Sequence, residues 1–386
     1  MIGVGEQIIF WTCAALLAYI YAGYPVVVYL VSVISPKPVK RGAMEPRVTV
    51  LITAFNEEAA IEAKLENTLA LRYPEAKLEI IVASDASTDR TDEIVKTFAD
   101  RGVKLFRQEG RAGKTATQNG AVAIASGDII LFSDATTIYA EDLLDSIVPD
   151  FADETVGCEA GRLVYVDDDC TSVGAGIQSY WNYETFLKSA ESSACSLIGA
   201  SGCLYAVRRS AYDPMYPEAC SDFLICTNIF RKGLRSVFAP DAVCYERTNK
   251  RSNDELRMRV RVIAQTFTDL WRNRDMLNPL NSGFYALELI SHKLLRYAVP
   301  FILITLLASS ALLASTSTFF AVILLLQVTF YALAFGGWLL ERTGRRLTIV
   351  AVPFYFVLAN LASALAFYKF LRGETYTRWE PIRDAS

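Results

Sequence analysis

The fold is decided by the stretch VTVLITAFNEE, residues 48–58, in which a run of β-branched and apolar residues ends in a polar sequence. Such a run predicts a short buried strand over Val48–Thr53. Helical spacing follows over Glu57–Leu71, and the next apolar run, at 78–83, predicts a second strand. Further strands are expected over 103–107 and 129–133, with helices ending near 99 and covering 116–125. This alternation is the βαβ rhythm of an open parallel sheet.

Polar side chains gather where these predicted strands end. Asn56 and Glu57 follow the first strand, Asp85 follows the second, and Asp134 follows the fourth. In open α/β sheets the ligand binds outside the carboxyl ends of the strands. We therefore expect a binding site at this edge of the sheet.

The chain lacks the usual glycine-rich phosphate cradles. Neither GxGxxG nor GxxxxGK[ST] follows the first strand. A bound diphosphate must then be neutralised in another way. We expect Asp134 to do this through Mg²⁺ or Mn²⁺, which prefer oxygen ligands, with help from Arg111 and Lys114 in the sequence RAGK.

Composition excludes several classes of function. A net charge of -4 argues against a nucleic-acid partner, because such proteins carry a basic excess. The chain has one histidine, His292, so acid–base chemistry is expected from carboxylates. The eight cysteines form no CxxC pair, and their spacing predicts neither a zinc site nor a disulfide framework.

Both ends of the chain are strongly apolar. Ile8–Ile34 carries no charge and spans about 40 Å as a helix, enough to cross a bilayer. Lys37, Lys40 and Arg41 follow it and place the central region in the cytosol. Three more crossings are expected, over 295–314, 318–340 and 347–371. Three crossings would place the tail outside the cell, whereas its basic residues favour the cytosolic side. A re-entrant segment in place of one crossing is therefore an open alternative.

The expected organisation has five parts. Residues 277–293 are aromatic and amphipathic, which favours an interfacial helix, although a buried connecting helix has the same pattern. The parts are an N-terminal transmembrane helix (1–36), a cytosolic domain (37–276), the interfacial helix (277–293), three transmembrane segments (294–372) and a tail (373–386).

The strings TAFNEE, SDASTD, RAGK and FSDAT, in this order between residues 53 and 137, resemble those of a family 2 glycosyltransferase. The flanking apolar segments are similar to those of its membrane-bound polysaccharide-synthase branch, which includes hyaluronan, chitin-oligosaccharide and poly-N-acetylglucosamine synthases. The resemblance implies an α/β GT-A domain with a Rossmann-like mixed sheet. It also implies an inverting, metal-dependent enzyme of the plasma membrane. Such an enzyme transfers sugar from a nucleotide-sugar, UDP-sugar in this branch, to a saccharide or lipid-linked acceptor in exopolysaccharide synthesis.

The resemblance also assigns residues. The metal motif falls on Asp134 and Thr136, where threonine replaces a second aspartate, and Asp222 in SDF matches the general base. The family has a further motif whose tryptophan stacks on the acceptor sugar. This chain retains only the arginine of that motif. The loss of the tryptophan leaves room for an enzyme that adds a single sugar or a limited number of sugars. The nucleotide-sugar residues would be Ala54, Asn56, Glu57, Asp85, Arg111, Lys114 and Asp134, and the acceptor residues Ser201, Gly202, Cys203 and Arg261.

Simpler interpretations stand beside these assignments. Asp134 and Asp222 suit helix caps, Asp85 suits a turn, and Arg111 and Lys114 suit a solvated loop. Arg261 lies on a basic face that would serve anionic lipid alone. For the whole chain the alternatives are a sugar-phosphate transferase and a non-catalytic scaffold or export partner. A homo-oligomer or an export partner would complete a translocation pore.

Overall fold

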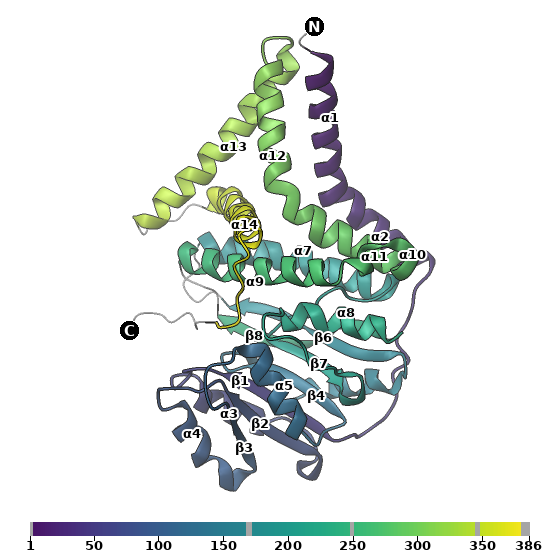
Figure 1. The fold of residues 1–386 in the computed structure, drawn as a ribbon, viewed down its shortest axis with the longest axis vertical. Helices are drawn as coiled ribbons and strands as arrows, with labels where there is room; N and C mark the ends of the chain where they lie inside the picture. The colour runs from purple at the N-terminus through teal and green to yellow at the C-terminus, as the bar shows by residue number, and fades with distance from the viewer. Residues whose placement is uncertain (1–2, 167–171, 248–250, 344–347, 380–386) are drawn as a thin grey trace.

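One mixed sheet forms the centre of the protein (Figure 1). The structure is a computed structural model that describes residues 3–166, 172–247, 251–343 and 348–379. Within them, eight strands run in the order β3-β2-β1-β4-β7-β6-β8-β5. The strands are β1 (Val48–Ala54), β2 (Leu78–Ser84), β3 (Val103–Arg107), β4 (Ile129–Asp134), β5 (Ile138–Tyr139), β6 (Val156–Val166), β7 (Leu204–Arg208) and β8 (Arg235–Arg247).

The first half of the sheet is parallel, as predicted. β1 pairs with β2 on one side and with β4 on the other, so the strand order reverses beside β1. The register sets Ala54 opposite Ser84 and Thr53 opposite Asp134. β1, β2 and β4 each run one residue beyond the predicted end, and β3 has the predicted bounds. The three strand ends therefore meet at one edge, at a topological switch point.

Alternation along β1 builds a core on each face of this sheet. Val48, Val50 and Ile52 point into one hydrophobic cluster, whereas Leu51 points into the other, because successive side chains of a strand face opposite ways. All four are fully buried. Because β1 is buried on both faces, its sequence is a continuous apolar run and does not alternate between apolar and polar residues.

The second half turns antiparallel. β7 pairs antiparallel with β4 and β6, and β6 and β8 run parallel to each other. Helices and single turns connect the strands. They are α3 (Ile61–Leu69), η2 (Glu75–Lys77), α4 (Thr91–Thr97), η3 (Ala99–Arg101), α5 (Lys114–Ile124), α6 (Leu143–Ile147), η4 (Val148–Ala152), α7 (Ser172–Ala194), η5 (Arg209–Ala211), α8 (Ser221–Arg231), α9 (Ser252–Arg272) and η6 (Arg274–Leu277).

Four long apolar helices project from the side of the domain that carries α7 and α9 (Figure 1). By length and composition they are able to cross a membrane: Val4–Ile34, Phe284–Leu313, Thr318–Arg342 and Ile349–Leu371. The first consists of α1 (Val4–Ala18), a π-helical turn η1 (Tyr19–Gly23) and α2 (Tyr24–Ile34). The others contain α12 (Leu295–Leu313), α13 (Thr318–Arg342) and α14 (Thr348–Leu371).

The last of these helices differs from the others. Ala362 and Ala366 of α14 pack against Val260, Ile263 and Phe267 of α9 in a small hydrophobic cluster. Tyr355 of α14 donates a hydrogen bond to Glu255 of α9 at 3.0 Å. In the most apolar window of α14 56% of residues are buried, against 11% for α13. α14 is therefore held against the domain that contains the sheet.

The segment 277–293 is not one interfacial helix. It divides into α10 (Pro279–Ser282), α11 (Phe284–Glu288) and a π-helical turn η7 (Leu289–Leu294). Gly283 has φ +56, which interrupts the helical path, and the helix restarting at Phe284 runs on into α12. Tyr285 and Leu289 are fully buried in a cluster with Phe223 and Leu270. Residues 278–281 are exposed, whereas the part from Phe284 onward is largely buried and continues into α12.

Candidate active site

Asp85 organises the edge where the three parallel strands end. Its side chain is fully buried. Its Oδ1 accepts hydrogen bonds from the backbone N–H groups of Ala112 at 2.7 Å and Gly113 at 3.1 Å, and from the Thr117 hydroxyl at 3.1 Å. The carboxylate thus fixes the loop that precedes α5. Its contact with a nucleotide stays a prediction, as does that of Ala54, which is buried at the end of β1.

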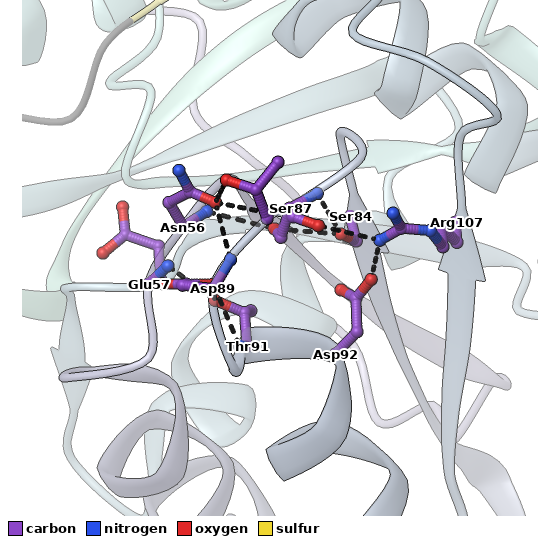
Figure 2. A network of polar contacts seen from close by, with 9 residues as sticks. Asn56, Glu57, Ser84, Ser87, Asp89, Thr91, Asp92 and Arg107 are labelled. Atoms are coloured by element: carbon purple, nitrogen blue, oxygen red, sulfur yellow. Dashed lines mark hydrogen bonds and ion pairs between the residues drawn. The ribbon is translucent and has the colours of Figure 1, made fainter.

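Asn56 joins the loops that follow β1 and β2 (Figure 2). Its backbone is left-handed, with φ 54, and its Oδ1 accepts from the backbone N–H of Thr88 at 2.7 Å and of Asp89 at 3.3 Å. The N–H of the next residue, Glu57, donates to Thr91 Oγ1 at 2.7 Å. These bonds, made by the sequences TAFNEE and SDASTD, shape one rim of the site, which we call the nucleotide rim because the nucleotide is predicted to bind there.

The RAGK segment faces this rim with two cations. The Arg111 guanidinium lies 3.5 Å from the centroid of the Phe55 ring and 3.6 Å from Asp85 Oδ2. Lys114 Nζ forms a 2.5 Å ion pair with Asp134 Oδ1. Burial lowers the pKa of Lys114, but Asp134 and Asp222 raise it by a larger amount, so the amine is charged. Neither side chain is a solvated loop charge.

A second carboxylate stands near the expected metal position. Thr136, which occupies the place of the second aspartate, has its Oγ1 3.5 Å from Glu246 Oε1 of β8. Burial, and then the charge of Asp134, raise the pKa of Glu246 to about 7. A divalent cation would offset the repulsion that the Asp134 charge exerts on the Glu246 carboxylate. Asp134, Thr136 and Glu246 therefore fit a Mg²⁺ or Mn²⁺ ion.

Asp222 approaches the same group from the other half of the sheet. It lies in the first turn of α8 and does not cap that helix, because the N-cap position is Cys220. A Cβ atom built on Gly202 would lie 3.3 Å from Asp222 Oδ2 and 3.5 Å from Lys114 Nζ. The Asp222 carboxylate and the Lys114 amine therefore both lie beside Gly202, where a side chain would contact them.

Arg261 completes this cluster from α9. Burial lowers its pKa, whereas the charges of the nearby Cys220, Asp134 and Asp222 oppose that shift. The interpretation that Arg261 serves only anionic lipid does not fit a guanidinium near these groups. The helix-cap interpretation of Asp134 does not hold either, because Asp134 is the last residue of strand β4 and its carboxylate pairs with Lys114.

The expected acceptor strand contributes unequally. Ser201 is buried and its hydroxyl accepts a hydrogen bond from Lys188 Nζ at 2.7 Å. Cys203 points into the core, where its Sγ lies 3.5 Å from Cys244 Sγ, and only 4% of the residue is exposed. The acceptor contact that we expected of the Cys203 side chain therefore has almost no exposed surface to make it.

Two features of the site have no signal in the local sequence. Asp269 of α9 accepts from the Cys220 backbone N–H at 3.0 Å and from the Tyr216 hydroxyl, and so holds the residue that precedes α8. The tail reaches the nucleotide rim, where Trp379 meets Phe55 edge to face at 6.1 Å and its carbonyl accepts from Arg111. Both depend on contacts between segments far apart in the chain.

Comparison with known proteins places this geometry in a family. Residues 49–215 match the model of Glycosyl transferase family 2. A beta-monoglucosyldiacylglycerol synthase of Nostoc sp. is 35% identical over 116 residues, 29% of this chain and 25% of that protein. A poly-beta-1,6-N-acetyl-D-glucosamine synthase of Staphylococcus aureus is 26% identical over 236 residues, 59% of this chain and 52% of that protein. The chain thus spans a quarter to about half of these relatives' length.

One solved structure matches almost the whole chain. The mannosyltransferase PcManGT from Pyrobaculum calidifontis, in complex with GDP-Man and Mn²⁺, has a TM-score of 0.73 and 26% identity. The match covers 95% of this chain and 99% of that one. It therefore includes the apolar helices as well as the sheet. Residues 49–215 of the chain are therefore similar to glycosyltransferase family 2.

Proposed function

We propose that the protein is an inverting, metal-dependent glycosyltransferase that moves a sugar from a nucleoside-diphosphate sugar to a saccharide or lipid-linked acceptor. The observation that carries this proposal is the meeting of Asp134, Lys114 and Asp222 around Gly202. One carboxylate with a cation lies on the nucleotide side, and a separate carboxylate lies beside the expected acceptor segment. Displacement at a sugar carbon needs this division of charge.

The donor side of the site neutralises a diphosphate. Asp134, Thr136 and Glu246 would hold the divalent cation, which when bound supplies charge stabilisation to the leaving diphosphate. Lys114 and Arg111 add fixed positive charge on the same side. Glu246 supplies the carboxylate that the motif at 134–136 lacks, which weighs against a degenerate, non-catalytic scaffold.

Asp222 serves the acceptor in this proposal. Its carboxylate takes the proton of the acceptor hydroxyl while the hydroxyl oxygen bonds to the anomeric carbon. The bond from that carbon to the diphosphate breaks, and the nucleoside diphosphate leaves. Attack opposite to the leaving group inverts the anomeric configuration. Asp269 positions Asp222 by fixing the turn at Cys220.

The apolar helices place this reaction at a membrane. We propose that they insert into the plasma membrane, with the catalytic domain in the cytosol beside Lys37, Lys40 and Arg41. Membrane lipid is then a constant partner, and nucleic acid is not one. The similarity to a poly-N-acetylglucosamine synthase supports a role in cell-surface or exopolysaccharide synthesis, where a homo-oligomer or an export partner would handle the product.

The test measures nucleoside diphosphate released by the full chain purified in detergent. UDP-, GDP- and dTDP-sugars are screened with Mn²⁺ and with Mg²⁺, beside Asp134→Ala, Asp222→Asn and the surface control Asp213→Asn. We expect one donor to be cleaved, with losses of about a hundredfold or more in both site variants and none in the control. Release of a nucleoside monophosphate would identify a sugar-phosphate transferase instead. Full activity in Asp222→Asn would remove that residue as the base.

A further inference from the structure

Two lysines lie on the membrane-facing side of the expected acceptor strand. Lys188 of α7 donates to Ser201 at 2.7 Å, and only 7% of the residue is exposed. Lys293 lies in η7, at the start of the apolar helix Phe284–Leu313. Its Nζ would be 4.0 Å from a Cβ atom built on Gly199. Both amines therefore reach the strand that ends beside Asp222.

Neither lysine has a carboxylate within ion-pair distance among the residues that the structure describes. The nearest acidic residues are engaged elsewhere. Glu184 pairs with Arg296 and with His292 Nε2 at 3.2 Å. Glu191 accepts from the Tyr24 hydroxyl at 2.5 Å and from His292 Nδ1 at 2.6 Å. Lys188 is buried and Lys293 is half-buried. A buried amine without a counterion is costly, and an anionic ligand removes that cost.

The electrostatic balance points the same way. Burial lowers the pKa of Lys188, and the charge of Lys293 acts in the same direction, whereas Glu184 and Asp222 oppose it. An anion beside the Lys188 amine would favour its charged form. The donor diphosphate has its own lysine, Lys114, which is already paired with Asp134 on the other side of Gly202.

The surroundings indicate where such an anion comes from. Leu187 and Ala190, which flank Lys188 on α7, pack against Tyr24 and Val28 of the first apolar helix. Lys293 precedes α12 directly. A phosphate carried at the headgroup level of a bilayer therefore reaches both amines without leaving the membrane surface, whereas a neutral saccharide gains nothing from them.

We propose that Lys188 and Lys293 form a subsite for the phosphate or diphosphate of a lipid-linked acceptor. This inference rests on the proposed function and names the acceptor class for the same site. The phosphate lies on the membrane side of Gly199–Cys203, the segment that precedes β7, and Asp222 of α8 lies beside Gly202 of that segment. The two lysines are positioned to hold the acceptor, and they do not take part in donor cleavage.

The experiment compares farnesyl phosphate with farnesol, which share a chain and differ in the phosphate. Binding to the full chain in detergent is followed through tryptophan fluorescence, because the Trp181 ring lies 5.4 Å from Lys188 Nζ. We expect farnesyl phosphate to bind at least about tenfold more tightly than farnesol, as two charge-assisted contacts allow. Lys188→Met and Lys293→Met should each remove about that preference. Lys188→Arg should keep it.

The controls separate the possible sources and failures. Lys232→Met, at a surface ion pair with Asp213, should leave the preference intact. Inorganic phosphate is tested alone and as a competitor, and its full competition against farnesyl phosphate at equal concentration would overturn the lipid assignment. Equal binding of the two farnesyl compounds, or an unchanged preference in both methionine variants, would overturn the subsite. Loss of UDP or GDP binding in these variants would move the lysines to the donor site. If binding depends on the phosphate but no nucleoside diphosphate is released, the subsite is supported and the proposed transferase activity is contradicted.

Discussion

Asp85 illustrates how a carboxylate serves a ligand site from inside the protein. Its sequence position after β2 suggested a direct contact with the nucleotide. In the structure its oxygens receive the N–H groups of the RAGK loop and the Thr117 hydroxyl. Hydrogen bonds to a charged acceptor are each worth about 1.5–3 kcal/mol. The residue therefore determines where Arg111 and Lys114 stand.

Replacing Asp85 by alanine should weaken the site and the fold together. The loop loses its shared acceptor, so we expect nucleotide affinity to fall about tenfold or more and stability to fall by about 1–3 kcal/mol. Calorimetric titration with UDP or GDP and thermal unfolding measure the two effects. Asp145→Ala, at an exposed position of α6, is the matched control. Unchanged affinity in a less stable Asp85→Ala protein would limit the residue to a structural role.

Asp269 should make stability depend on pH. Burial raises its pKa from 3.8 to about 7. Between these values the folded protein binds more protons at this site than the unfolded chain, so stability falls as pH rises from about 4 to about 7. The full shift corresponds to about 4 kcal/mol as an upper bound. Asp269→Asn, which cannot ionise, should flatten the melting temperature between about pH 5 and about pH 7. An identical slope in Asp269→Asn and wild type, with Asp213→Asn as control, would contradict this assignment.

Other site residues lay beyond reach of the sequence because their roles arise from pairing between distant strands and helices. Glu246 meets Thr136 through the pairing of β5 with β8, which joins residues 138–139 to 244–245. A single sequence shows neither that pairing nor its register. Asp134, Lys114 and Asp222, in contrast, stand in motifs that the sequence displays, and the structure brings all three together.

At the scale of elements, strands were predicted more accurately than helix starts. The strand bounds follow from apolar runs, which burial on both faces of the sheet requires. α3 begins at Ile61, later than the predicted Glu57, because the preceding residues are held in a turn. The Glu57 and Glu58 N–H groups donate to Thr91 and Asp89 of the neighbouring loop. Helical spacing alone does not reveal such competition from tertiary hydrogen bonds.

The tail is an element whose place no pattern indicated. Its backbone passes so close to the RAGK loop that a Cβ atom on Gly113, at φ +93, would lie 1.9 Å from the Thr377 carbonyl oxygen. The Tyr376 carbonyl also accepts from Gln265 of α9 at 2.9 Å. A nucleotide that approaches Phe55 and Arg111 therefore meets Trp379.

Nucleotide binding should change the environment of Trp379. Its indole lies against Phe55 and near the Arg111 guanidinium, so a base or phosphate arriving there alters its emission. Fluorescence titration with UDP and GDP should show a change in wild type that is largely lost in Trp379→Phe. Trp271→Phe, which removes an exposed indole from α9, should retain it. The same change in Trp379→Phe and wild type would place the nucleotide away from the tail.

At the scale of the whole molecule, composition predicted apolar ends around an α/β domain, and the four long apolar helices agree with that. Their arrangement was not predictable, because hydropathy measures what a helix is made of and not what it lies against. α13 and α14 have similar mean hydropathy, 2.2 and 2.0, yet their most apolar windows are 11% and 56% buried. The difference comes from the neighbours of α14: α9 covers Ala362 and Ala366, and Tyr180 and Trp181 of α7 pack against its Phe354–Leu358 portion.

The return of the tail to the nucleotide rim has a topological consequence. A chain that leaves the catalytic domain at Leu277 and touches it again at Thr377 has passed through the bilayer an even number of times in between. Three apolar helices lie in that interval, and α14 is the one held against α9, so we propose that α12 and α13 make the passage out and back and that α14 rests at the cytosolic surface. Lys369 and Arg372 then end on the cytosolic side, where basic residues are favoured. Protease digestion of inside-out vesicles should therefore remove a C-terminal epitope tag, and right-side-out vesicles should protect it. The reverse pattern would make α14 a third crossing and detach the tail from the domain.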